Sequence, residues 1–338
     1  MILGSKDLRS DRLLVAELGN NHEGDPSIAL ELVDAAAQAG ADAVKVQVID
    51  PERLVHHSQI ERIQQLSKFR LPFSVFEEMA DRAIRRNMLF IASAFDIRSL
   101  ERISELTVAT KIASGDLDYT PLLIRAAQIG KPIMLSTGMA TLDEIRTAVD
   151  VIAHYLPPGS SPDGSLALLH CVSLYPTPWE QAALRDTETL GRTFNLVTGY
   201  SDHTLGVEMA ALALAFGARI VEKHFTLDKN RSSFRDHQLS ADPEELGKLA
   251  TIVHEFDRIV GTGAKLPSPA EREMARAARR TIVASRAVPK GTRLTADDLD
   301  YIRPRNDGLS PSAGQSLIGR KLLQPLDYQE VIVEGFLE

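Results

Sequence analysis

Residues 13–48, LLVAELGNNHEGDPSIALELVDAAAQAGADAVKVQV, place two short apolar runs on either side of a helical pattern. The runs at 13–18 and 43–48 are predicted strands, and the segment 28–39 has the apolar period of a helix. A strand, a helix and a second strand in this order predict two parallel strands joined by a crossover helix.

The same alternation continues to about residue 260. Further strands are predicted at 89–94, 110–113, 132–136, 167–172, 196–200 and 219–225, and further helices at 75–86, 142–154 and 207–216. Eight such units in about 250 residues predict a closed (β/α)8 TIM barrel. An open, doubly wound parallel sheet is the alternative.

The character of the chain changes after this alternation. Residues 1–260 are predicted to form the barrel domain, and residues 261–280 a linker that begins GTGAKLPSP and continues as a charged helical pattern. Residues 281–338 contain short apolar runs and turns, which predict a small β-rich domain. A domain of this size buries little core alone, so we expect it to pack on a larger surface.

Composition argues against several functional classes. The 338 residues carry a net charge of −8, which disfavours nucleic acid as a partner. The N-terminus does not resemble a secretory signal, and no apolar run is long enough to predict a membrane span. The single cysteine, Cys171, leaves no intrachain disulfide and no cysteine cluster for a metal. We therefore expect a cytoplasmic protein, not bound to a membrane, that recognises small molecules in a pocket.

Polar side chains gather where the predicted strands end, which is where a TIM barrel places its active site. They are Glu17, Lys45, Gln47, Ser93, Lys111, Ser114, Ser136, His170, Ser201, His203, Glu222 and His224. The aromatic residues Phe95 and Tyr175 follow two of the same strands. Side chains alternate along a strand, so Lys45 and Gln47 share one face, and Glu222 shares a face with His224. Charged groups inside a barrel are costly unless they are paired or bind a ligand, so these residues predict a polar pocket.

The residue types in this set indicate the kind of ligand. Lys45 and Lys111, with several Ser and Thr hydroxyls nearby, suit a phosphate or carboxylate group. His203 and His224, with carboxylates nearby, suit a divalent metal, although two hydrogen-bonded core histidines are the alternative. Two other conspicuous residues have simpler interpretations: Cys171 is predicted to be an inert buried thiol, and His237 a surface or cap residue.

Eight ordered motifs carry a family resemblance over nearly the whole chain. They are AELGNNHEGD (16–25), VKVQ (44–47), KIASGD (111–116), IMLSTGM (133–139), LLHCVSLYPTP (168–178), GYSDHT (199–204), VEKHFT (221–226) and DHQLS (236–240). In this order and spacing the sequence resembles the sialic acid synthases. The tail from IVASRAVPKGTRLTADDL (282–299) onward resembles the antifreeze-like (SAF) domain that these synthases carry.

The resemblance implies a TIM barrel followed by an antifreeze-like domain, and a reaction that joins phosphoenolpyruvate to an N-acylated hexosamine such as N-acetylmannosamine. It also implies a divalent cation, manganese or magnesium, and a domain-swapped homodimer. Position in the motifs also implies a role for each site residue. Phosphoenolpyruvate would be held by Lys45, Lys111, Ser114, Ser136 and Ser201, and the sugar would be placed by Gln47, Ser93, Phe95 and Tyr175. Proton transfer or positioning would fall to Glu17, Glu222 and Asp236, and the metal would be bound by His203 and His224. Arg303 of the tail, or Arg305, would contact the sugar's acyl group in the partner's barrel.

The sequence departs from the family pattern at the expected sugar end of the pocket. Ser74 and Ser173 stand where relatives have Asn, and the segments NRSSFR (230–235) and RPRNDG (303–308) differ from the usual ones. These changes leave open whether the sugar is N-acetylmannosamine, a diacetamido sugar or another aldose. Two other functions are alternatives: a phosphoenolpyruvate synthase of seven- or eight-carbon keto-sugar acids, which lacks such a tail, and a non-catalytic sugar-binding protein, which would lose the charged pocket residues.

Overall fold

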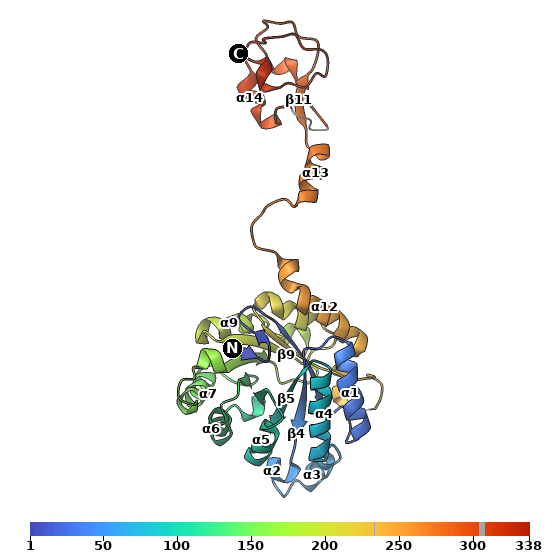
Figure 1. Cartoon of the computed structure of the whole chain (residues 1–338), viewed down its shortest axis with the longest axis vertical. Helices are drawn as coiled ribbons and strands as arrows, with labels where there is room; N and C mark the ends of the chain where they lie inside the picture. Colours follow the sequence, from blue (N-terminus) through green and yellow to red (C-terminus); the bar gives the residue numbers. More distant parts are fainter. Residues whose placement is uncertain (233, 304–307) are drawn as a thin grey trace. The chain divides into compact units, whose positions relative to one another are not determined.

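Eight parallel strands close into a barrel in the computed structural model, which describes residues 1–232, 234–303 and 308–338 (Figure 1). The strands are β3 (Leu13–Gly19), β4 (Ala43–Val48), β5 (Leu89–Ala94), β6 (Ala109–Ile112), β7 (Ile133–Ser136), β8 (Leu166–Cys171), β9 (Val197–Asp202) and β10 (Ile220–His224). They follow one another round the barrel in chain order, and β10 pairs with β3 to close it. The predicted (β/α)8 barrel is confirmed, and the open doubly wound sheet is wrong.

Helices connect successive strands and surround the barrel (Figure 1). The main ones are α1 (Pro26–Gln38), α4 (Phe73–Arg85), α5 (Ile97–Ser104), α6 (Thr120–Ile129), α7 (Leu142–Tyr155), α9 (Arg185–Phe194), α10 (Glu208–Ala213) and α12 (Pro243–Val260). Shorter helices, α2 (Pro51–Leu54), α3 (Ile60–Ser67), α8 (Pro162–Ser165) and α11 (Arg235–Leu239), lie in the connections. Local signals set the helix starts: Asp25, for example, accepts hydrogen bonds from the Ser27 and Ile28 amides at the start of α1.

The alternation of side chains along each strand divides the core into two parts. Outward residues such as Leu14, Val44 and Phe90 pack against the helices. Inward residues near the strand starts, such as Val15 and Ile91, form a second apolar cluster with Met1, Leu3 and Leu8 around the hairpin β1 (Ile2–Leu3) and β2 (Lys6–Asp7). The start of the barrel is therefore filled with apolar side chains, and its polar inward residues lie toward the other end.

Lys223 and Asp202 form a fully buried ion pair in the wall of the barrel. Lys223 Nζ lies 2.8 Å from Asp202 Oδ2 and donates a hydrogen bond of 2.6 Å to the Thr204 carbonyl oxygen. Tyr200 donates to the second Asp202 oxygen over 3.2 Å. Lys223 thus faces away from Glu222, as its position in the strand predicts, and it has a structural role. Removing one charge of such a pair leaves the other buried and uncompensated.

The second compact unit runs from Gly261 to Glu338 and is described here by itself. It contains α13 (Pro269–Ala278), the antiparallel pair β11 (Thr281–Ala284) and β12 (Leu299–Ile302), and α14 (Gly314–Leu317). Its own apolar core includes Ile282, Val288, Leu317, Leu322 and Ile332. Along the described ranges, none of the helices combines the length and apolar character that crossing a bilayer requires.

Candidate active site

A buried ionic network occupies the inside of the barrel where β3, β4 and β10 end. Lys45 Nζ lies 3.0 Å from Glu17 Oε2 and 3.5 Å from Glu222 Oε1. The register of the strands explains why Glu17 and Lys45 lie close together, because Glu17 is paired with Lys45 of β4 on one side and with His224 of β10 on the other. All three charged groups point inward by the period of two that the sequence predicted.

Lys111 of β6 also lies near the Glu222 carboxylate. Its Nζ donates a hydrogen bond of 2.6 Å to Ser136 Oγ and lies 3.9 Å from Glu222 Oε1. Ser201 Oγ donates to the same Glu222 oxygen over 2.9 Å. Glu222 therefore lies between two lysines and a hydroxyl, and its side chain is buried.

Burial and neighbouring charges shift the pKa values of Glu17 and Glu222 in opposite directions. Burial raises the pKa of Glu17, and the like charge of Glu222 adds to this effect. Burial opposes ionisation of Glu222 as well, but Lys111 and Lys45 outweigh it and lower the pKa of Glu222. Burial also lowers the pKa of Lys111, and Glu222 offsets this only in part. The two carboxyl groups therefore differ in acidity, with Glu222 the stronger acid and Glu17 the weaker.

His203, His224 and Tyr175 group at the rim of the pocket. The ring centroids of His203 and His224 are 5.6 Å apart, and that of Tyr175 is 4.2 Å from His203. His203 Nδ1 donates a hydrogen bond of 2.7 Å to the Val172 carbonyl oxygen, and burial lowers the pKa of its imidazole. This contact fixes the neutral tautomer with Nε2 as the atom that carries a lone pair, which is the form that binds metals.

His203 and His224 are the two imidazole groups at this rim that could act as metal ligands. Within the ranges that the structure describes, no group of three or more His, Cys, Asp and Glu side chains is arranged to hold a metal.

Ser114, Gly138 and Cys171 form a tight contact at the ends of β6, β7 and β8. The Gly138 amide donates to Ser114 Oγ over 3.0 Å, and Cys171 Sγ lies 3.0 Å from the same oxygen. A Cβ at Gly138 would stand 2.5 Å from Ser173 Oγ, so this approach requires glycine. Cys171 is buried as predicted, but its position in β8 turns it inward beside Ser114, which the sequence interpretation missed.

The residues predicted to place the sugar are only partly brought together. Gln47 Nε2 donates to Glu17 Oε1 over 2.7 Å, and Lys45 Nζ donates to Ser93 Oγ over 3.5 Å. Phe95 follows β5 at the same end of the barrel and is half-buried. Arg303 follows β12 in the second unit and is exposed, and Arg305 lies outside the described residues.

Comparison with known proteins gives the family. The NeuB family model matches residues 32–265, and the SAF domain model matches residues 279–337. The chain belongs to the NeuB family. It is 38% identical to an uncharacterized protein of Methanocaldococcus jannaschii, over 94% of this chain and 92% of that one. It is 35% identical to the N,N'-diacetyllegionaminic acid synthase of Legionella pneumophila, over 91% of this chain and 90% of that one.

Among solved structures, the N-acetylneuraminic acid synthetase of Leptospira borgpetersenii, crystallised with citrate, superposes with a TM-score of 0.74 at 34% identity. The match covers 81% of this chain and 94% of that one. The predicted resemblance to sialic acid synthases with an SAF domain is confirmed. This NeuB-family chain is an enzyme of the sialic-acid-synthase type.

His237 of the NeuB-family chain is fully buried, so the prediction of a surface or cap residue is wrong. Its Nε2 lies 2.8 Å from Glu23 Oε1, and its Nδ1 lies 2.7 Å from Thr226 Oγ1. These contacts tie α11, which carries the buried Asp236, to the loop after β3. Burial raises the pKa of Tyr175, and the charges of Cys171 and Asp236 act in the same direction.

Two polar residues expected near the pocket lie elsewhere. His170 has the outward position in β8, where its Nε2 donates to the Ala182 carbonyl oxygen over 2.9 Å and its ring stacks on Tyr200. Ser74 is exposed on the first turn of α4. In the departing segment 230–235, Ser233 lies outside the described residues.

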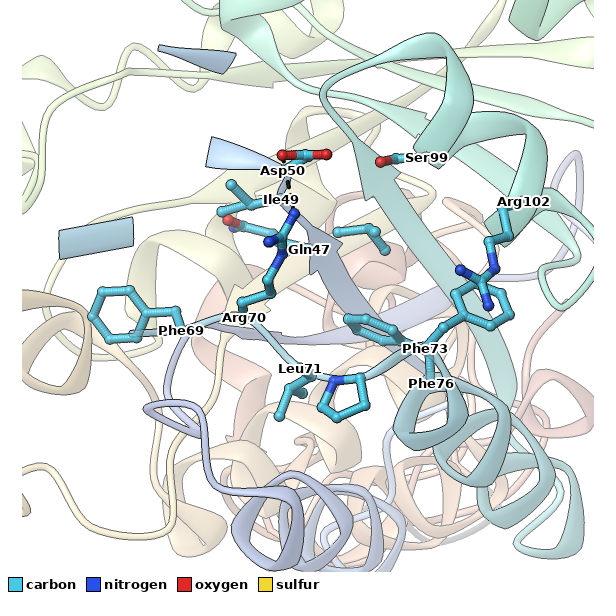
Figure 2. A pocket seen from close by; sticks show the side chains of 12 residues that line it. Gln47, Ile49, Asp50, Phe69, Arg70, Leu71, Phe73, Phe76, Ser99 and Arg102 are labelled. Carbon is cyan, nitrogen blue, oxygen red and sulfur yellow. Dashed lines mark ion pairs between the residues drawn. The ribbon is translucent and has the colours of Figure 1, made fainter. Parts of the chain in front are cut away.

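A cavity of about 440 Å³ opens beside Gln47, between the end of β4 and the helices α4 and α5 (Figure 2). It is lined by Gln47, Val48, Ile49, Asp50, Phe69, Arg70, Leu71, Pro72, Phe73, Phe76, Ser99 and Arg102. No sequence signal pointed to it, because residues 49–50 and 69–72 belong to connections without a regular apolar period.

Proposed function

We propose that this NeuB-family enzyme condenses phosphoenolpyruvate with an N-acylated hexosamine, giving a sialic-acid-type nonulosonic acid and phosphate. The observation that carries the proposal is the buried pair of lysines around Glu222, with the Ser136 and Ser201 hydroxyls beside them. Such a concentration of donors at the C-terminal ends of the barrel strands suits a small ligand with several negative charges.

The phosphate and carboxylate groups of phosphoenolpyruvate would take the place of the carboxylates that now neutralise the lysines. Lys45 and Lys111 would supply the charge, and Ser114, Ser136 and Ser201 the hydroxyl donors. Because these groups are already fixed by strand pairing, they need little reorganisation when the ligand binds.

In the proposed reaction, the methylene carbon of phosphoenolpyruvate attacks the aldehyde carbon of the open-chain sugar. Water then adds to the cationic C2, and the tetrahedral intermediate expels phosphate with its bridging oxygen. Glu17, whose pKa is raised, would hold a proton for the new hydroxyl, and Glu222, whose pKa is lowered, would accept one from water. Gln47, Ser93, Phe95 and Tyr175 would orient the sugar, and Asp236 would position it from α11.

A divalent cation, manganese or magnesium, would supply Lewis-acid polarisation of the aldehyde when bound. His203 and His224 would hold it, with His203 presenting Nε2 because its Nδ1 is bonded to Val172. Imidazole ligands favour manganese over magnesium, which prefers oxygen ligands.

Phosphate release tests the proposal. With phosphoenolpyruvate and Mn²⁺ present, we expect release of inorganic phosphate when an N-acylated mannosamine is added, in equal amount to the sugar consumed. Arabinose 5-phosphate and erythrose 4-phosphate serve as the matched controls, since they are the acceptors of synthases that make shorter keto-sugar acids. Release with these two and none with N-acylated sugars would overturn the proposal.

We further propose that Arg303 acts in the barrel of a partner chain within a homodimer. A guanidinium donates a fork of hydrogen bonds to an acyl oxygen and stays charged at any working pH. Exchange of the second unit between two copies would make the interface self-complementary.

Complementation between two inactive variants tests this exchange. We expect His224→Ala and Arg303→Ala to regain activity when the chains are dissociated and reassociated together, because each mixed dimer then has one site with neither defect. Mixed dimers that form but stay inactive would show that the second unit serves its own barrel or none.

A further inference from the structure

We propose that the contact between Glu23 and His237 positions Asp236 for the sugar-dependent step of the reaction. Both are positioning residues, which act through the helix α11 and not through contact with the substrate. This inference rests on the proposed function, in which Asp236 positions the sugar, and adds the two residues that set the place of Asp236.

His237 follows Asp236 directly in α11 and fixes this helix to two other segments. The His237 side chain is fully buried. Its Nε2 lies 2.8 Å from Glu23 Oε1 in the loop after β3, and its Nδ1 lies 2.7 Å from Thr226 Oγ1 after β10. Since both ring nitrogens have partners, only one orientation of the imidazole satisfies them, and the backbone that carries Asp236 is held with it.

The carboxylate of Glu23 holds this segment at two points. Burial opposes the ionisation of Glu23, but hydrogen bonds from His237 and Ser232 outweigh it and lower the pKa of Glu23. Ser232 precedes α11, and His237 lies within it. An ionised carboxylate only accepts hydrogen bonds, so His237 Nε2 carries a proton and donates to Glu23. Such charge-assisted hydrogen bonds are stronger than neutral ones, which suits a contact that sets a position.

The loop after β3 holds Glu23 in a strained backbone conformation. Glu23 has a φ of 48°, and Gly24 has a φ of 81°. A Cβ at Gly24 would lie 2.1 Å from the Lys68 carbonyl oxygen, so the turn is pressed against the end of α3. Non-glycine residues with positive φ are uncommon and gather at functional sites, where their surroundings hold them in place. The strain at Glu23 therefore supports a functional role for its side chain.

Other contacts keep α11 in the structure independently of Glu23. Asn21 Nδ2 donates to Ser240 Oγ over 2.9 Å and to the Phe225 carbonyl oxygen over 2.8 Å. The ring of Phe69 (Figure 2) packs against that of Phe234, just before α11, with the centroids 4.9 Å apart. Loss of the contact between Glu23 and His237 should therefore loosen the position of α11 while the barrel stays folded.

The position of α11 matters to the site because of the charge that Asp236 carries. Burial contributes most to the raised pKa of Tyr175, and the charge of Asp236 adds to it, so Asp236 acts electrostatically on Tyr175. The lysines of the proposed phosphoenolpyruvate site, in contrast, lie on β4 and β6. A displaced α11 should therefore impair the use of the sugar and leave the binding of phosphoenolpyruvate unchanged.

The test measures kcat/KM for an N-acylated mannosamine, and separately KM for phosphoenolpyruvate, by phosphate release with Mn²⁺ present. In Glu23→Ala we expect kcat/KM for the sugar to fall by roughly 10- to 100-fold, because small displacements of a positioning group have effects of this size. KM for phosphoenolpyruvate should stay close to the wild-type value. Glu23→Gln keeps an oxygen that accepts from His237, so it should recover most of the activity. Glu23 is 33% exposed, so its truncation leaves no cavity of the kind that truncating the buried His237 would create.

A double variant separates positioning from a general effect on the fold. We expect Asp236→Ala alone to lower kcat/KM for the sugar. Adding Glu23→Ala to it should cost no more than about a further twofold, because the carboxylate that Glu23 positions is then absent. Gln238→Ala, at an exposed position of the same helix, should match the wild type.

Losses that multiply in the double variant would overturn the proposal. Wild-type kcat/KM in Glu23→Ala or in Asp236→Ala would overturn it as well, and so would a KM for phosphoenolpyruvate that rises in Glu23→Ala as much as KM for the sugar. No turnover of any N-acylated sugar by the wild type would instead overturn the proposed function.

Discussion

Replacing Lys111 with methionine is expected to lower kcat/KM by about a thousandfold or more while leaving the protein at least as stable as the wild type. In the proposed site this buried lysine would meet the charge of phosphoenolpyruvate, and a preorganised cation has its largest effect where solvent access is low. Burial already lowers the pKa of Lys111, so the ammonium is held there at a cost to the folded state. Phosphate release and thermal unfolding, measured on the same preparation, test both parts.

Two comparisons make the Lys111 result specific. Lys45→Met should be inactive and also less stable than the wild type, because it removes the 3.0 Å partner of the buried Glu17. Lys248→Met, on the exposed face of α12, should match the wild type in both measurements. Near-normal kcat/KM in Lys111→Met would remove this residue from the phosphoenolpyruvate site.

Alanine at His203 or His224 is expected to abolish turnover and to weaken Mn²⁺ binding by about a hundredfold or more. With two imidazoles as the protein ligands, each carries a large share of the affinity. Binding is measured directly, by the electron paramagnetic resonance signal of free Mn²⁺, so that the result does not depend on activity. Thermal unfolding without metal should change little, which separates loss of a ligand from loss of the fold.

His254→Ala provides the control for the metal experiment, since His254 is partly exposed on α12 and pairs with Asp42 at 3.1 Å. If the His203 and His224 variants bind Mn²⁺ as tightly as this control does, the two residues are hydrogen-bonded core histidines, the alternative that the sequence left open.

The sequence predicted the barrel and its inward charges because both depend on local periods. Every barrel strand was located to within two residues, and the alternation of side chains correctly turned Lys45 and Glu222 inward and Lys223 outward. The same rule, applied to β8, would have turned His170 outward and Cys171 inward. The error at His170 came from treating residues at a strand end as a group without following the period.

Contacts between distant parts of the sequence could not be predicted from local sequence patterns. His237 is buried by a contact with Glu23, which is 214 residues away in the sequence, and no period predicts such a pairing. An ion pair between Arg70 and Asp50 joins two irregular connections that flank α2 and α3. Family resemblance drew attention to Ser74 in this region, but Ser74 is not among the residues that line the cavity beside Gln47, although Phe73 and Phe76 on the same helix are.

The fate of the bridging oxygen of phosphoenolpyruvate tests the central claim most directly. With ¹⁸O at that position, an N-acylated mannosamine as acceptor and the wild-type enzyme, the account predicts that the released phosphate carries the label, because the C–O bond breaks. Released phosphate without the label, with the ¹⁸O retained in the sugar product, would contradict it.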